Sequence, residues 1–165
     1  MWAGGEFALA KKQIEEAIAA SSQPVKWGTG PHEHDLYAVL TDIAAQQRDL
    51  AAIREYAPLA EQFAARDQHQ LYLAIIHRAM AVAHRLAGEY ADAASRSNQA
   101  LDLFTKLGTR WQIGRTLIEF GELEADRQNH ASAGEYFSRA LVEFEALRAA
   151  PDADKTRQRL KNLPL

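Results

Sequence analysis

The sequence lacks several features that define large classes of protein. It contains no cysteine, which excludes disulfides, thiol nucleophiles and cysteine-ligated zinc or iron–sulfur sites, and nothing indicates an oxidising compartment. No apolar run approaches the roughly 20 residues that cross a bilayer. The first residues also lack a basic leader followed by an apolar stretch. These absences favour a soluble, cytoplasmic protein that does not enter a membrane.

Excess positive charge and catalytic signatures are missing as well. Nineteen Lys and Arg stand against 22 Asp and Glu, so the net charge is -3, whereas a nucleic-acid binder normally carries a basic stripe. There is no glycine-rich phosphate loop and no nucleophile elbow. Carboxylate pairs such as Glu119 and Glu122 have a spacing that is common on any solvated helix face. We therefore expect no nucleic-acid partner, no cofactor and no enzymatic activity.

Helical periodicity is what the sequence does have. Apolar residues and alanines recur at spacings of three and four along almost the whole chain, the pattern of amphipathic α-helices. Gly88 marks a turn between two strongly periodic segments. The predicted helix pairs are, in chain order, 35–46 with 50–65, 71–86 with 90–107, and 111–127 with 131–148. The sequence therefore predicts an all-α fold of three helical hairpins in series.

The spacing of small residues indicates a repeat of forty residues. The tetrapeptide AGEY occurs twice at an offset of forty-six, but that offset places Arg127 over Ala81, where a hairpin needs a small side chain. At an offset of forty, Ala81 falls on Gly121 and Ala93 falls on Ala133. Small residues then meet small residues, so forty is the predicted unit and the AGEY echo is a coincidence.

Two of these units resemble the tetratricopeptide repeat (TPR). The stretches are HRAMAVAHRLAGEYADAASRSNQAL and LIEFGELEADRQNHASAGEYFSRAL. Their large and small motif positions are Met80, Ala81, Gly88, Tyr90, Ala93, Ala100 and Leu101 in the first, and Leu117, Phe120, Gly121, Ala133, Phe137, Ala140 and Leu141 in the second. The resemblance implies a right-handed α-α superhelix, or solenoid, of antiparallel hairpins. The usual TPR unit has about 34 residues, so a unit of forty residues is longer than usual. In this it is similar to the long TPR variants of bacterial regulatory and signalling proteins.

The resemblance treats the whole chain, 1–165, as a single TPR-like domain. Its parts are the second helix of a partial repeat at 4–22, repeats at 31–66, 70–108 and 110–149, and a C-terminal capping helix at 152–162. The partial repeat has no first helix, so its apolar stripe of Phe7, Ile14 and Ile18 needs a cover. We expect either that the chain is an excerpt of a longer protein or that this helix mediates a homodimer.

Two copies depart from the motif. The first repeat has Thr41 and Arg48 at small or glycine positions, and Pro58 lies inside its second helix, where a kink is expected. In the third repeat the turn falls on Gln128 and Asn129. Asn tolerates the left-handed backbone, so Asn129 is expected to keep that turn intact.

The first helices of TPR hairpins line a concave groove, and the resemblance places candidate binding residues there. They are Asp35 and Asp42 in the first repeat, Ile75, Arg78, Val82 and Arg85 in the second, and Arg115, Ile118, Glu119 and Glu122 in the third. The three arginines either grip an anionic ligand or pair with neighbouring acids. Family members that clamp chaperone tails have Lys and Asn where this chain has Ala38 and Asp42, so that activity is not expected.

Metal and aromatic sites are weakly indicated. His32 and His34 flank Glu33, but no further ligand follows at a recognisable spacing, so no metal site is expected. Trp111 is expected to pack at a hairpin edge rather than to form a binding platform.

Two functions fit these expectations. The first is a non-enzymatic scaffold that binds a peptide or a partner protein in its concave groove. The alternative is a regulatory sensor module that binds a small ligand or a signalling peptide and relays the event to an effector domain outside this chain.

Overall fold

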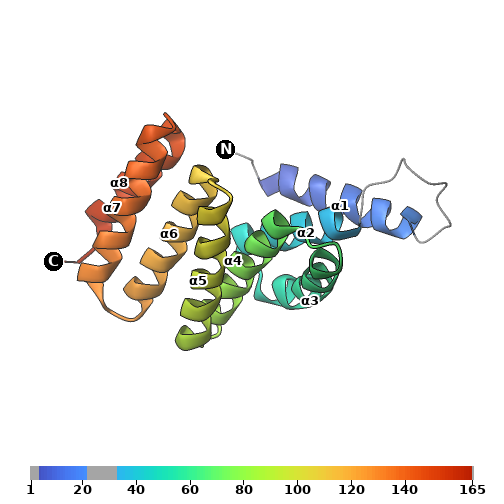
Figure 1. The fold of residues 1–165 in the computed structure, drawn as a ribbon. Helices are drawn as coiled ribbons and strands as arrows, with labels where there is room; N and C mark the ends of the chain where they lie inside the picture. The colour runs from blue at the N-terminus through green and yellow to red at the C-terminus, as the bar shows by residue number, and fades with distance from the viewer. Residues whose placement is uncertain (1–3, 22–32, 165) are drawn as a thin grey trace.

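The described part of the chain is entirely helical and arranged as a stack of hairpins. The computed structural model describes residues 4–21 and 33–164, in which there are eight helices and no strand. The helices are α1 (Gly4–Ser21), α2 (Glu33–Gln47), α3 (Leu50–Arg66), α4 (Gln70–Leu86), α5 (Tyr90–Lys106), α6 (Arg110–Asp126), α7 (His130–Ala146) and α8 (Ala150–Asn162). Successive helices pack on each other from α1 at one end to α7 and α8 at the other (Figure 1). This arrangement confirms the predicted all-α helical solenoid.

Left-handed turn residues recur every twenty residues. A positive φ occurs at Arg48, Gln68, Gly88, Gly108, Gln128 and Arg148. In each case the next helix begins two residues later, and the helices from α3 to α7 all have 17 residues. Two helices and their two turns therefore span forty residues, which confirms the forty-residue unit and excludes forty-six.

The turns also correct one expectation about the third repeat. Gln128 has φ +62, whereas Asn129 has φ -94 and is the N-cap of α7. The fixed twenty-residue register places Gln128, not the better-suited Asn129, at the left-handed position. Arg48 occupies the equivalent position after α2 with φ +58, so the first repeat makes the same turn without a glycine. Helix α3 runs continuously through Pro58, which is exposed.

Small side chains permit the close helix contacts that the repeat predicts. Ala93 and Ala133 are 1% and 0% exposed, and Ala81 is 3% exposed. A Cβ atom added to Gly121 would collide with the Phe137 ring of the neighbouring α7. The predicted role of these positions in packing each hairpin is confirmed.

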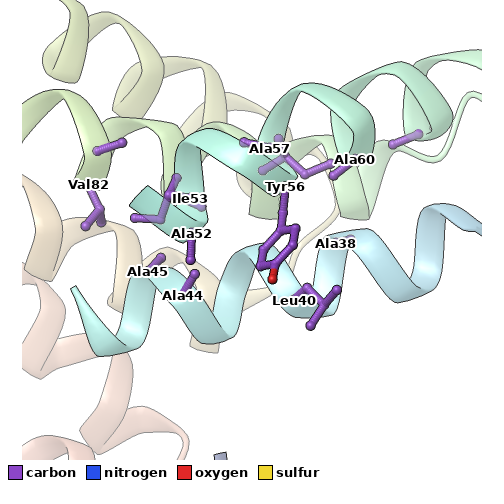
Figure 2. Packing of buried hydrophobic residues seen from close by; sticks show 14 residues of the cluster. Ala38, Leu40, Ala44, Ala45, Ala52, Ile53, Tyr56, Ala57, Ala60 and Val82 are labelled. Carbon is purple, nitrogen blue, oxygen red and sulfur yellow. The ribbon is translucent and has the colours of Figure 1, made fainter. Parts of the chain in front are cut away.

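The first hairpin follows the same rule and also covers part of α1. Ala44, Ala45 and Ala52 lie where α2 and α3 approach each other, and the Tyr56 ring extends from α3 toward α2 (Figure 2). The partly buried Ile14 and Ile18 of α1 pack against this cluster. These two side chains are therefore partly covered by the chain itself. The Phe7 side chain lies outside the described residues.

Helix α8 takes the place of a further first helix. It begins at Ala150, forty residues after Arg110 of α6, and Pro151 lies in its first turn, where proline is well tolerated. This start is two residues before the predicted one. Buried Ala153 and Thr156 hold α8 against α7. The row of first helices thus extends from α2 through α4 and α6 to α8. Within residues 4–21 and 33–164, no helix combines the length and apolar character that a membrane crossing requires.

Candidate binding site on the inner face

The first helices present one continuous surface, here called the inner face. Side chains spaced three or four residues apart lie on one side of a helix, and ion pairs join these stripes from helix to helix. The inner face comprises Asp35, Val39, Asp42 and Gln46 on α2; Ile75, Arg78, Val82 and Arg85 on α4; Trp111, Arg115, Ile118, Glu119 and Glu122 on α6; and Lys155 and Arg159 on α8. All ten predicted groove residues are among them.

A buried ion-pair network joins α2, α4 and α6. Asp42 Oδ1 accepts hydrogen bonds from Arg78 Nη2 at 3.0 Å and from Arg115 Nη2 at 3.3 Å, and its Oδ2 accepts from Arg115 Nη1 at 3.1 Å. The Arg78 side chain is only 4% exposed, and its other terminal nitrogen donates to Gln112 at 2.5 Å. Since α4 lies between α2 and α6, the row of first helices curves so that Asp42 and Arg115 meet over it.

Protonation states follow from this geometry. Burial raises the pKa of the Asp42 carboxyl, but the positive charges of Arg78 and Arg115 outweigh burial and hold that pKa below its ordinary value. Burial lowers the pKa of Arg78 to about 10, and the nearby Arg115 charge adds to this effect against the attraction of Asp42. Asp42 and Arg78 are therefore both charged at neutral pH, and the single Asp42 carboxylate is shared by two guanidinium groups.

A second network lies nearer the carboxyl ends of the first helices. Arg48 Nη1 lies 2.8 Å from Glu119 Oε2, although the two residues are 71 positions apart. Burial lowers the pKa of Arg48, but Glu119 outweighs it and the net shift is upward. Arg85 Nη1 lies 2.7 Å from Asp126 Oδ2 and its Nη2 lies 3.9 Å from Glu119. Arg48 thus joins the end of α2 to α6, which reinforces the bridge made by Asp42.

In the described chain the three predicted groove arginines pair with the protein's own acids. Arg78 and Arg85 each have a carboxylate partner on an adjacent first helix, and Arg115 of α6 pairs with Asp42 of α2 across α4. Val82 and Ile118, predicted to contact a partner, are only 2% and 8% exposed because neighbouring helices cover them. Between α2 and α6 the predicted groove is therefore largely filled by the protein's own side chains.

The inner face is open between α6 and α8. A hollow of about 240 Å³ lies there. Its lining residues are Gln46, Arg48, Arg115, Ile118, Glu119, Phe144, Asp152, Lys155, Thr156 and Arg159. Two contacts between α6 and α8 accompany it: Trp111 Nε1 donates to Asp152 at 3.1 Å, and Arg159 Nε donates to Glu122 at 2.7 Å. This hollow is a candidate binding site on the inner face.

Trp111 adds an accessible aromatic surface near this hollow. It is 42% exposed, and the Arg115 guanidinium lies 4.9 Å from its ring centre. It bridges to α8 at the edge of the last hairpin, as predicted, but much of its ring remains accessible, contrary to a purely packing role.

Sequence reasoning missed three cations of the hollow. Arg48 appeared as a misfit at a glycine position, and Lys155 and Arg159 were assigned to the charged face of a capping helix. The forty-residue offset contains the signal that would have found two of them, since it places Lys155 on Arg115 and Arg159 on Glu119.

The described residues contain one further group with ligand-like geometry. His84, Glu89 and Asp92 bring potential metal-binding atoms within 4.8 Å of one another. A 2.6 Å contact between His84 Nδ1 and Glu89, together with Arg54 at 3.5 Å from Glu89, accounts for the arrangement without an ion. His32 and the His34 side chain, considered for metal binding in the sequence, lie outside the described residues.

The overall fold is similar to one solved by crystallography. A crystal structure of BtubC (BKLC) from P. vanneervenii matches with a TM-score of 0.64 and 16% sequence identity, over 96% of this chain and 73% of that chain. Identity this low shows a shared fold and nothing about activity. No model of a known protein family and no curated protein matches the sequence. The comparisons therefore establish the helical architecture alone.

Proposed function

We propose that this protein is a cytoplasmic, non-enzymatic interaction scaffold of the TPR type, which binds a peptide or a segment of a partner protein along its inner face. The hollow between α6 and α8 is the observation that carries the proposal, because it is a concave site on a row of rigid helices. The forty-residue hairpin unit and its small-residue positions support the family assignment.

Exposed apolar groups on the first helices support peptide binding. Val39 on α2 and Trp111 on α6 are both 42% exposed on the inner face. Tryptophan is among the residues that most often dominate binding energy at interfaces. Apolar groups next to charged ones suit an extended segment, because side chains of both kinds then find partners along it.

A matched pair of valines tests this proposal. Peptides selected from a displayed random library against the purified protein are measured by fluorescence anisotropy with Val39→Glu and Val142→Glu. Val142 is 60% exposed on the second helix α7, so both variants place the same charge on an exposed site. We expect Val39→Glu to weaken binding and Val142→Glu to leave it unchanged. Equal effects of the two variants on peptide binding, or no effect of either variant, would contradict binding at the inner face.

One observation favours the sensor alternative. The ion pairs of Asp42 with Arg115 and of Arg48 with Glu119 tie α2 to α6 across the curve of the solenoid. A ligand that competed for these charges would change that curvature, and its effect would equal its differential affinity for the two shapes. A soluble metabolite that raises the melting temperature of a protein that binds no peptide would favour the sensor over the scaffold.

A further inference from the structure

We propose that the hollow between α6 and α8 is an anion site that holds acidic side chains of the bound segment. The inference rests on the proposed scaffold function and specifies the chemistry of its partner. It assigns the principal charge contacts to Arg48, Arg115, Lys155 and Arg159, of which only Arg115 was a predicted groove residue.

The charge balance of the lining supports this assignment. Four cationic side chains line the hollow against two acids, Glu119 and Asp152. Glu119 is already engaged by Arg48 at 2.8 Å, and Asp152 accepts a hydrogen bond from Trp111. Within the described residues, no ion pair is formed by Lys155. Arg159 pairs with Glu122 at 2.7 Å and Arg115 with Asp42 at 3.1 Å, so Lys155 is the lining cation that the carboxylates of the described residues leave without a partner.

Arg115 contributes a second unmatched charge. Asp42 carries one negative charge but pairs with both Arg78 and Arg115. Arg78 is the inner partner, with 4% of its side chain exposed, whereas the Arg115 side chain is 18% exposed and lines the hollow. Asp42, Arg78 and Arg115 together therefore carry one excess positive charge, and the residue among them that lines the hollow is Arg115. Arg115 Nη1 and Nη2 both donate to Asp42, at 3.1 and 3.3 Å, so Arg115 acts on a ligand through its charge rather than through free N–H groups.

The size of the hollow suits an acidic side chain. At about 30 Å³ per water molecule, 240 Å³ corresponds to about eight waters. Ile118 and Phe144 border the hollow but are only 8% and 2% exposed, so its accessible walls are mainly the charged side chains. Inorganic phosphate would meet the same cations, and competition between phosphate and free glutamate distinguishes the two sources of negative charge.

Two lysines of α8 give a matched test. Fluorescein-labelled hexaglutamate and hexaglutamine peptides are titrated with the wild-type protein, Lys155→Glu and Lys161→Glu, and binding is followed by anisotropy. Lys161 is exposed on the same helix and does not line the hollow, so both variants change the net charge equally. We expect hexaglutamate to bind, hexaglutamine not to bind, and Lys155→Glu to lower affinity about tenfold, since it removes a charge-assisted contact and adds repulsion. Lys161→Glu should change affinity by less than about twofold, because an exposed charge outside the site is screened by salt.

Each outcome decides the proposal. Circular dichroism and the melting temperature verify that both variants are folded. Equal weakening by the two lysine variants, or equal binding of hexaglutamate and hexaglutamine, would overturn the anion site. If inorganic phosphate displaces hexaglutamate at a lower concentration than free glutamate does, the cationic site stands but its preferred ligand is phosphate. If library peptides bind the inner face while hexaglutamate does not bind, the acidic-partner inference fails and the scaffold function stands.

Discussion

The inner face has two sections built on the same repeat but with opposite charge relations. Between α2 and α6, acids and arginines from different helices neutralise one another and fill the surface, as in the contact of Asp42 with Arg78. Between α6 and α8, the helices leave a hollow in which cations outnumber acids. The backbone period is the same in both sections, so the side chains at equivalent positions decide which section is structural and which is free to bind.

The largest expected effect lies in the closed section. Asp42→Asn removes the carboxylate that neutralises buried Arg78, and breaking a buried pair in this way is strongly destabilising. We expect a loss of about 3–5 kcal/mol in the free energy of unfolding, measured by urea denaturation. Glu122→Gln removes a partly exposed pair with Arg159 beside the hollow and should cost about 1 kcal/mol. Equal losses would contradict the distinction between the two sections.

Acidification should reduce the difference in unfolding free energy between the wild-type protein and Asp42→Asn. The folded pKa of Asp42 is lowered below the value of 3.8 that applies to the unfolded chain. Its stabilising contribution is therefore fully present above pH 3.8 and is lost as the pH falls through the lower folded pKa. The difference in unfolding free energy between wild type and Asp42→Asn should be constant from neutral pH to about pH 5 and shrink below 3.8. A difference that grows on acidification would contradict the assigned ion pair.

Helix packing beneath the open section is tested by two glycines. Gly121→Ala forces a Cβ into the Phe137 ring, and overpacking of this kind costs about 1–3 kcal/mol, partly offset by the higher helix propensity of alanine. Gly134→Ala gives the same propensity gain, but its Cβ would lie 3.6 Å from Leu163, an ordinary contact. We expect the first change to lower the melting temperature and the second to raise it. A rise in both would show that α6 and α7 are not in close contact.

The smallest expected changes in stability come from substitutions in two turns, at Gly88 between α4 and α5 and at Gln128 between α6 and α7. Gly88 has φ +77 with open space around it, so Gly88→Ala should lose about 1 kcal/mol through backbone strain alone. Gln128 has φ +62, so Gln128→Gly should gain a similar amount. Opposite shifts of the urea midpoint would show that the same turn operates in both repeats. Shifts of the same sign would indicate that the turns differ.

The features that could be predicted from the sequence depend on residues that are close together in the chain. Helix positions and the forty-residue period follow from small residues such as Gly121 and Ala133, whose role depends on close neighbours in one hairpin. Non-glycine turn residues such as Arg48 and Gln128 were not predictable from propensity, because the register of the stack imposes their conformation. The contact of Arg48 with Glu119 spans 71 residues, and only the curvature of the assembled helices brings the two together.

The most direct test of an open, cationic section is to map where an acidic segment binds. Hexaglutamate is titrated into isotopically labelled protein, and amide chemical shifts are followed by nuclear magnetic resonance. We predict that the largest shifts cluster in α6, in α8 and at the turn containing Arg48, with Lys155 among the residues affected. Shifts concentrated on the second helices α3, α5 and α7, or confined to α2 and α4, would contradict the account.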